Sequence, residues 1–215
     1  MDTKTRILQA AVDLFELHGV RGASIRDICS KADANIAAVN YYFGGKDALY
    51  AEVIRSVFSQ TFDLDPMPDS SLPSDGGDAQ HLCNWIDWYI RRQHDERTAK
   101  FMNFVRLEIA DPTSMLQEIL DTVITPIFVE LQKLISAILP QGSSQELIDF
   151  HCDQVNGPIL KRMLLEPMNN LVSPETKSTI DLDQTIEWTQ RTVIASLKAS
   201  GAEVSDEWQC NLLNR

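Results

Sequence analysis

The chain has 215 residues, of which 44% are hydrophobic and 23% charged, and its formal net charge at pH 7 is −12. This composition fits one or two soluble globular domains, and no stretch approaches the roughly 18 consecutive apolar residues of a membrane-spanning helix. The polar start MDTKTR has no signal-peptide core behind it, so we expect a cytoplasmic protein. Four scattered cysteines without CxxC spacing predict reduced thiols and no metal site.

A first helix is predicted before Gly19, which supplies its stop. Its apolar face repeats with the period of 3.6 residues that is typical of an amphipathic helix. The members of this face are Ile7, Leu8, Ala11, Val12, Leu14, Phe15 and His18. We interpret His18 as a residue of the helix end rather than as a ligand.

A second, short helix is predicted to begin near Ile25. The Ser24 hydroxyl can cap it, and Asp27, three residues on, can reach back to the backbone NH of Ser24. Ile25, Ile28 and Ala32 then form an apolar stripe.

A three-residue turn, Asp33-Ala34-Asn35, separates this helix from the next one. Asn35 is a good cap for a helix from Ile36 to Tyr42 whose core-facing residues are Val39 and Phe43. Two short helices joined by such a turn indicate a DNA-reading helix-turn-helix over residues 24–43.

The second of these helices carries the side chains expected to meet DNA. Small residues at its start, Ala37 and Ala38, would let it enter the major groove, where the Asn40 amide can pair with adenine. Tyr41 and Tyr42 are expected to donate to phosphates. Gly44-Gly45 then turns the chain, and Lys46 opens a helix that can hold another phosphate.

This layout, SIRDIC followed by a turn, NIAAVNYYF and GGKDALY, resembles the N-terminal domain of TetR-family transcriptional regulators over roughly residues 4–60. The most specific part is Phe43 followed by a glycine turn, Lys46 and Leu49. Asp33 stands where the family usually has glycine, which is tolerable because Asp visits left-handed backbone conformations. The resemblance implies that ten residues lie at or near the DNA: Ser24, Arg26, Asn35, Ile36, Ala37, Ala38, Asn40, Tyr41, Tyr42 and Lys46.

The charge is unevenly distributed along the chain. Residues 1–50 contain six basic and six acidic side chains, so the entire net charge of −12 belongs to residues 51–215. Phosphates repel an acidic body, so the N-terminal part is the expected contact face. Its near-neutral charge predicts modest non-specific binding and the need for two such domains acting together.

A long helix from Lys46 to about Phe62 is expected to connect two domains. The segment that follows, DLDPMPDSSLPSDGGD, is rich in Pro, Gly, Ser and Asp, which is typical of a mobile loop. We therefore predict three parts, a DNA-binding domain 1–61, a flexible acidic loop 62–78, and an effector-binding and dimerisation domain 79–215.

The sequence pattern of the C-terminal part is helical throughout and has no alternating strand segments, so the expected fold is all-α. The predicted helices cover 79–97, 99–110, 113–139, 144–166 and 182–200. Pro126 should kink the third of these unless it starts a new helix, and Asn156-Gly157-Pro158 should weaken the fourth.

The last two predicted helices carry apolar stripes that could form a four-helix interface between two copies or fill the core of one copy. Their members are Leu147, Phe150, Val155, Ile159, Leu160, Met163, Leu164, Leu182, Ile186, Val193, Ile194 and Leu197. The family resemblance implies a homodimer that reads a palindromic operator.

A small-molecule effector pocket is expected between helices of residues 79–166, although aromatic stripes of this kind more often belong to a core. The candidate lining residues are Trp85, Trp88, Tyr89, Phe101, Phe104, Arg106, Glu108, Met115, Phe128 and His151. The segment FVRLEIADPTSMLQEILDTVITP is also similar to the C-terminal domain of the CecR-like branch of the family.

No catalytic motif accompanies these helices. His151-Cys152-Asp153 cannot form a triad by itself, because neighbours on a helix point about 100° apart. We therefore expect neither an enzyme nor a cofactor, but a repressor that leaves its double-stranded DNA operator when an effector binds. The alternative is a DNA-independent helical adaptor or small-molecule-binding protein.

Overall fold

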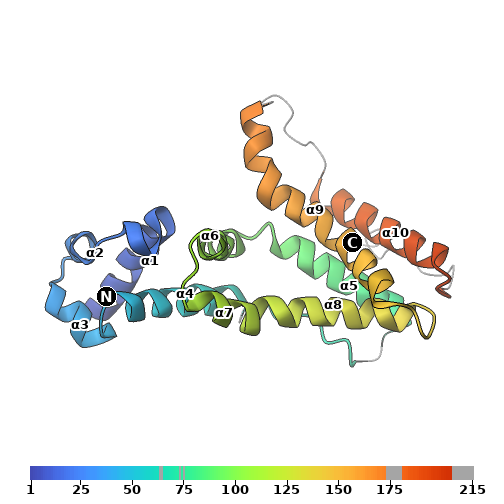
Figure 1. Ribbon diagram of the computed structural model, residues 1–215, viewed down its shortest axis with the longest axis horizontal. Coiled ribbons are helices and arrows are strands. Elements are labelled where there is room, and N and C mark those ends of the chain that lie inside the picture. Colours follow the sequence, from blue (N-terminus) through green and yellow to red (C-terminus); the bar gives the residue numbers. More distant parts are fainter. Residues whose placement is uncertain (63–64, 73, 75, 173–180, 205–215) are drawn as a thin grey trace. The chain divides into compact units, whose positions relative to one another are not determined.

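The computed structural model describes residues 1–62, 65–72, 74, 76–172 and 181–204, without the side chains of 159–172. All regular elements in these described ranges are helical, with no strand among them, which confirms the all-α fold (Figure 1). In chain order they are α1 (Thr3–Gly22), α2 (Ile25–Ala32), α3 (Ile36–Phe43), α4 (Lys46–Phe62), α5 (Gly77–Arg92), α6 (Glu96–Ala110), α7 (Met115–Ile119), the π-helix η1 (Leu120–Ile124), α8 (Thr125–Ile138), α9 (Gln145–Val172) and α10 (Leu182–Ala199).

The chain divides into two compact units. Unit 1 consists of Met1–Pro66 and Asp95–Val123, and unit 2 consists of Met67–His94 and Ile124–Arg215. Helices α6 and α7 therefore pack with the N-terminal helices, whereas α5 packs with the C-terminal ones.

These units do not follow sequence order as the predicted domains 1–61 and 79–215 do. The reason lies in α6, whose apolar side packs against α4 and α1. The predicted division of DNA-binding and effector-binding roles between those two ranges stays a prediction, but the packing boundaries fall at Pro66, His94 and Val123.

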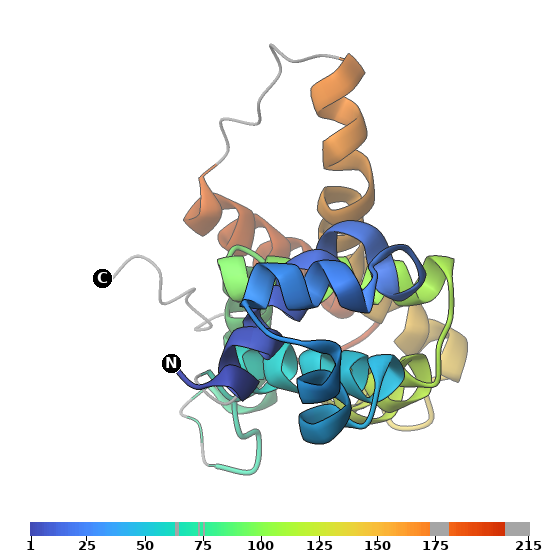
Figure 2. The same cartoon turned by 90° about the vertical axis from the view of Figure 1, so that its left-hand side faces the viewer.

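The core of unit 1 begins on α1, whose predicted apolar face is inward. Ile7, Ala11 and Phe15 are fully buried, and the Phe15 ring meets the Tyr50 ring of α4 edge-on with centroids 5.1 Å apart. Figures 1 and 2 show α1, α2 and α3 grouped together at one end of unit 1, with α4 leading away from them.

The end of α1 differs from the prediction. Gly19 has φ 65° and interrupts the helical backbone, but one more turn follows and reaches Gly22, so Gly19 bends the helix rather than stopping it. His18 is exposed and does not join the apolar face, because it stands next to this bend.

Helix α6 covers α4 within unit 1. The buried Phe101 ring lies 6.3 Å from the Phe58 centroid and 5.5 Å from the Phe62 centroid, and the Phe104 ring lies 6.3 Å from that of Tyr50. Because α4 begins directly after the glycine turn that follows α3, these aromatic contacts fix the helix to which the helix-turn-helix is joined.

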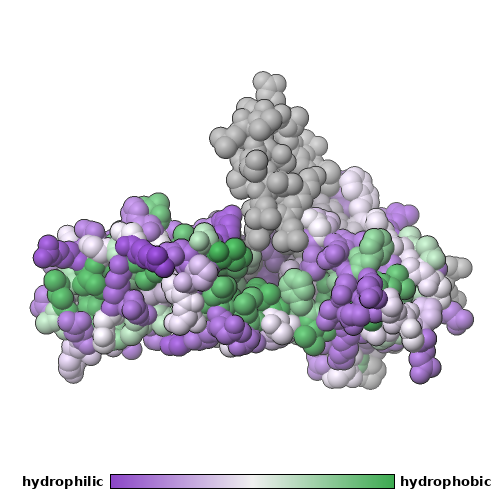
Figure 3. Space-filling model, in the orientation of Figure 1, coloured by the Kyte–Doolittle hydropathy of each residue, from purple (hydrophilic) through white to green (hydrophobic). Residues whose placement is uncertain are grey.

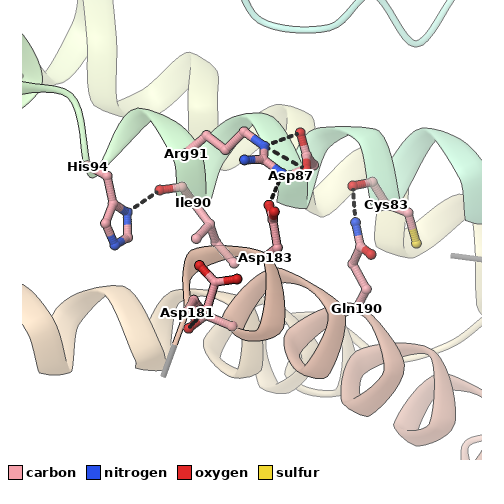
Figure 4. Close-up of polar contacts among 9 residues, drawn as sticks. Cys83, Asp87, Ile90, Arg91, His94, Asp181, Asp183 and Gln190 are labelled. Carbon is pink, nitrogen blue, oxygen red and sulfur yellow. Dashed lines mark hydrogen bonds and ion pairs between the residues drawn. The ribbon is translucent and has the colours of Figure 1, made fainter. Parts of the chain in front are cut away.

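In unit 2, helices α5, α8, α9 and α10 enclose one apolar cluster. Its most deeply buried members include Leu82, Trp85, Ile86, Leu131, Ile135, Val155, Ile186 and Leu197. Polar contacts join α5 to α10, since Gln190 donates to the Cys83 carbonyl over 2.8 Å and Arg91 bridges Asp87 and Asp183 (Figure 4).

Apart from Phe150, which is exposed, the described members of the stripes on α9 and α10 therefore lie in or against this core. Val155, Ile186 and Leu197 have no exposed surface, and Val193 and Ile194 are buried with them. The buried apolar side of α10 packs against both α5 and α9. The side chains of Ile159, Leu160, Met163 and Leu164 lie outside the described residues.

Pro126 starts a new helix, which confirms the second of the two predicted outcomes. It lies in the first turn of α8, where the missing N–H of proline costs no helical hydrogen bond. The wider π turn of η1 precedes it. Helix α9 continues through Asn156-Gly157-Pro158 without a break, so these residues do not end the helix, and the predicted weakening stays a prediction.

From Met67 on, the described part of the predicted flexible loop is anchored to unit 2. Met67 packs against the apolar cluster, Ser70 is hydrogen-bonded to Glu130, and the Lys133 ammonium lies 3.1 Å from the Ser70 hydroxyl.

Nowhere in the described ranges does a helix combine the length and the apolar character that spanning a bilayer requires.

Candidate nucleic-acid interface

Helix α2 begins at the predicted cap. The Ser24 Oγ accepts a hydrogen bond from the Asp27 backbone N–H over 3.1 Å, as expected. The Asp27 carboxylate does not close the box on the Ser24 backbone. It accepts instead from the Ser24 hydroxyl over 2.6 Å, so the two side chains hold each other.

The turn between α2 and α3 has the predicted conformation. Asp33 adopts the left-handed region with φ 46°, and the Ala34 N–H donates to the Cys29 carbonyl over 3.0 Å to close the helix end. Asn35 then caps α3, because its side-chain oxygen accepts from the Ala38 N–H over 2.8 Å.

Helix α3 has one buried apolar contact and an outward face. Val39 is fully buried and Phe43 is half-buried, so both core-facing predictions hold. On the outside, Ile36 is 46% exposed and Tyr41 is 83% exposed. Figure 3 shows hydrophobic and hydrophilic residues side by side on the visible face of the α2 and α3 region. Exposed apolar and aromatic side chains suit contact with bases and sugar–phosphate better than contact with water.

Polar groups complete this outward face. Asn40 is exposed on α3, and the Tyr41 and Tyr42 rings meet edge-on with centroids 5.0 Å apart. The pair presents two phenol groups from one place on α3, which fits the expected donation to phosphates.

The start of α4 provides a second anion-binding geometry. Gly44 and Gly45 have φ of 82° and 132°, values that favour glycine, and the Leu49 N–H donates to the Gly45 carbonyl over 3.0 Å. Lys46 is half-buried in the first turn of α4. The free N–H groups of that turn carry partial positive charge and the Lys46 ammonium is positively charged, so together they favour a phosphate.

All ten residues expected at the DNA therefore come from the continuous segment 24–46 of unit 1. Ser24, Arg26 and Ala37 are exposed, whereas Ala38 is half-buried beneath the outer face. Their contact with DNA stays a prediction.

Sequence reasoning missed the side chains that fix this segment from α1. The Arg6 guanidinium donates to the Ala32 and Asp33 carbonyls over 3.0 and 3.2 Å. The Lys4 ammonium lies 5.8 Å from the centroid of the Phe43 ring. The amphipathic pattern of α1 could not reveal these contacts, because they join residues far apart in the chain.

The predicted effector-pocket residues fall into different units. Phe101, Phe104, Arg106, Glu108 and Met115 belong to unit 1. The residues in unit 2 are Trp85, Trp88, Tyr89, Phe128 and His151. In unit 2 the Trp85, Trp88 and Tyr89 rings form one aromatic group, and burial raises the pKa of Tyr89 to about 12. Phe128 and Arg106 are exposed.

Glu108 is a buried carboxylate whose partners lie within unit 1. It accepts from the Tyr50 hydroxyl over 2.7 Å, from the Thr113 N–H over 2.9 Å and from the Thr113 hydroxyl. Burial raises the pKa of Tyr50, and the hydrogen bond to Glu108 raises it further. This network links α4 to the end of α6 through groups that each have a partner.

His151 is fully buried in unit 2. Its Nε2 lies 3.1 Å from the Ser200 hydroxyl, and its Nδ1 has no partner at hydrogen-bonding geometry. Burial lowers the pKa of His151, and the nearby Gln154 side chain offsets only part of that shift. The described residues contain no group of three or more His, Cys, Asp or Glu placed to hold a metal ion.

Two family profiles match separate ranges of the chain. Residues 7–53 match the bacterial regulatory proteins of the tetR family. Residues 79–197, more than half of the chain, match the C-terminal domain of the HTH-type transcriptional dual regulator CecR.

Individual relatives carry related descriptions. The "Probable HTH-type transcriptional regulator YttP" of Bacillus subtilis is 27% identical over 145 residues, which cover 67% of each chain. The dual regulator CecR of Shigella flexneri is 25% identical over 165 residues, 73% of this chain and 74% of that one. The transcriptional repressor NicS of Pseudomonas putida is 35% identical over 90 residues, 41% of this chain and 42% of that one.

Solved structures share the fold. A TetR-like transcriptional regulator from Rhodococcus sp. RHA1 superposes with a TM-score of 0.58 at 16% identity, covering 91% of this chain and 96% of that one. HlyIIR, a hemolysin II transcriptional regulator, gives a TM-score of 0.51 at 20% identity, again over 91% and 96%. At such identities the likeness concerns the arrangement of helices alone.

Proposed function

The chain belongs to the TetR family of bacterial transcriptional regulators, with a C-terminal region of the CecR type, and from that premise we propose that it is a ligand-responsive repressor. In this proposal a homodimer binds a palindromic operator in double-stranded DNA, and a small-molecule effector releases it. A regulator of this kind acts where the chromosome lies, so we propose a cytoplasmic location. We expect no enzymatic activity.

The observation that carries the proposal is the outward face of α3. Asn40 and Tyr41 are exposed there, while caps at Asn35 and Gly44 hold both helix ends. An exposed Asn beside exposed tyrosines offers one base-reading group bracketed by phosphate donors. Lys46 adds a phosphate contact one turn later.

An exposed stripe on unit 2 supports dimerisation. Trp188, Thr192, Ala195 and Ala199 are exposed at helical spacing along α10, and Trp188 is 52% exposed. Phe150, on the outside of α9, is 56% exposed. Small residues beside large aromatic side chains allow two helices to approach closely, and among these exposed residues Phe150 alone belongs to the apolar stripes that the sequence suggested.

Unsatisfied polar groups support an effector site in unit 2. Trp85 Nε1, His151 Nδ1 and Asn156 Nδ2 are buried without a hydrogen-bond partner. Because buried polar groups are almost always paired, such atoms are suitable partners for a bound polar molecule. An effector that binds more tightly to a conformation with a different spacing of the two α3 helices would weaken operator binding by the ratio of its two affinities.

The DNA-binding part is tested by selecting duplexes from random DNA with the wild-type protein and measuring their affinity by fluorescence anisotropy. We expect a palindromic sequence to be enriched. Replacing both Tyr41 and Lys46 with Ala should weaken binding about tenfold or more, because phosphate contacts provide much of the affinity. Asn40→Ala should instead change the selected sequence, since a base contact contributes discrimination of roughly 1–3 kcal/mol.

Lys133→Ala is the matched control, since it removes the same charge from an exposed site on α8 in unit 2. It should leave affinity unchanged. Full binding by the Tyr41→Ala, Lys46→Ala protein would reject the assignment of α3 and α4, and a wild-type protein that enriches no duplex would favour the DNA-independent adaptor.

The dimer is tested by sedimentation of the Trp188→Glu protein, which should shift from dimer to monomer because a charge in an apolar interface is desolvated without a partner. Val129→Glu is the matched control, because it makes the same kind of change at an exposed residue of α8 outside this stripe, and it should leave the dimer intact. A dimer that survives Trp188→Glu would exclude this stripe as the interface.

A further inference from the structure

Arg6, in the first turn of α1, binds the place where α2 ends. Its Nε donates to the Ala32 carbonyl over 3.0 Å, and its Nη2 donates to the Asp33 carbonyl over 3.2 Å. These bonds span 26 and 27 residues of the chain. A guanidinium is well suited to this role, because its donors form a rigid fork.

The end of α2 has two features that such a fork can stabilise. The last carbonyls of a helix have no partner within the helix and carry partial negative charge. In addition, Asp33 is the one non-glycine residue with positive φ among the described residues, and a side chain is strained in that conformation. Arg6 satisfies the carbonyls on both sides of the strained residue.

The position of α3 depends on this turn. Asn35, the cap of α3, comes two residues after Asp33, and Lys4 contacts Phe43 at the other end of α3. The first turn of α1 is itself held by Asp2, whose carboxylate accepts from the Thr5 N–H over 2.7 Å. One turn of α1 therefore contacts both the turn that precedes the reading helix and the last residue of that helix.

We infer that Arg6 is a positioning residue for operator recognition, because its fork fixes the turn that sets the orientation of α3. This inference rests on the proposed function. Arg6 acts through the backbone of the turn and does not serve as a phosphate contact, since its guanidinium donates to the Ala32, Asp33 and Met1 carbonyls and to the Thr3 hydroxyl of its own chain.

The test compares wild-type and Arg6→Lys proteins on a duplex selected from random DNA by the wild type. Lysine keeps the charge but cannot form the fork, so affinity should fall about tenfold. Arg6→Gln also removes the charge, and its slope of affinity against salt should match that of the wild type, because Arg6 neutralises no phosphate in this inference. Arg21→Lys, the same replacement near the other end of α1, should change affinity less than about twofold, since the Arg21–Asp111 pair is exposed.

A rescue separates positioning from general stability. Asp33→Gly removes the strain at the turn, so adding it to Arg6→Lys should restore affinity about threefold or more, whereas a protein weakened elsewhere would gain nothing at α3. Amide hydrogen exchange reports the turn without DNA, and the Ala34 amide, which is bonded to Cys29, should exchange faster in Arg6→Lys.

The following results would overturn the inference about Arg6 or the proposed function on which it rests. Wild-type affinity in Arg6→Lys, or a tenfold loss that Asp33→Gly does not relieve, overturns the positioning role. A flatter salt slope in Arg6→Gln overturns it in favour of a phosphate contact. If the wild type selects no duplex, the proposed operator binding fails as a whole, and hydrogen exchange at Ala34 still shows whether the fork holds the turn.

Discussion

Unit 1 and unit 2 treat the polar groups that folding buries in different ways. In unit 1, Glu108 accepts hydrogen bonds from Tyr50 and Thr113, and Arg6 donates to two carbonyls. In unit 2, an apolar cluster encloses Trp85, while Trp85 Nε1, His151 Nδ1 and Asn156 Nδ2 have no partner.

Under the proposed function, this difference corresponds to two tasks. A surface that must meet a rigid duplex benefits from satisfied polar contacts, because they hold each helix in one orientation. A unit that must respond to a small molecule can leave groups unsatisfied until that molecule supplies their partners. We therefore expect unit 1 to lose stability when a buried polar group is removed, and unit 2 to tolerate such a change.

The largest effect is expected from Glu108→Ala in unit 1. It leaves the Tyr50 hydroxyl and the Thr113 N–H buried without an acceptor and opens a cavity, so the free energy of unfolding should fall by about 3 kcal/mol. Urea unfolding followed by circular dichroism measures this loss.

Glu118→Ala provides the matched control on α7, where the Glu118 carboxylate forms an exposed pair with Arg55 over 2.7 Å. An exposed ion pair contributes roughly 0–1 kcal/mol, so this protein should remain close to wild type. If the two replacements lowered the free energy of unfolding equally, the buried Glu108 network would contribute no more to stability than an exposed ion pair, and the contrast between the units would fail.

The sequence predicted the helix-turn-helix because its determinants are local. Ser24 and Asn35 cap helices that start one residue later, and Gly44 ends α3 in the left-handed conformation. Each of these signals acts within about one helical turn, so no knowledge of tertiary packing was needed.

The supporting contacts could not be predicted in this way. The Tyr50–Glu108 hydrogen bond joins residues 58 positions apart, and periodicity shows that α6 has an apolar side without showing that α4 covers it. The same limit affected α10, where Ile186 and Leu197 turned out to fill the core while Trp188 is exposed. An apolar stripe identifies a buried face, but its partner depends on the whole fold.

A smaller effect is expected from a pair of asparagines, one in each unit. Asn156→Leu in unit 2 removes a buried donor that has no partner, so stability should stay the same or rise by up to about 1 kcal/mol. Asn103→Leu in unit 1 removes the 2.8 Å hydrogen bond to Glu16 and should lower stability by about 1 kcal/mol. Thermal unfolding of both proteins measures the difference, and a loss in Asn156→Leu as large as that in Asn103→Leu would show that unit 2 is equally intolerant.

The smallest effect concerns the pH dependence of unit 2, because a single group carries it. Burial lowers the folded pKa of His151 below its ordinary value of 6.5, so the unfolded chain binds a proton that the folded unit excludes. The neutral imidazole therefore favours the folded state fully above the unfolded pKa, and this advantage declines as pH falls through 6.5 toward the folded pKa.

Tryptophan fluorescence reports unit 2, since residues 1–66 and 95–123 contain no tryptophan. Between pH 7 and pH 5 the urea midpoint should fall more for the wild type than for His151→Gln, while His18→Gln, a change at an exposed histidine of unit 1, should keep the wild-type slope. Identical slopes for the wild type and His151→Gln would mean that the buried imidazole gains a proton as readily as the unfolded one, and the unpartnered Nδ1 would then have water beside it rather than an apolar core.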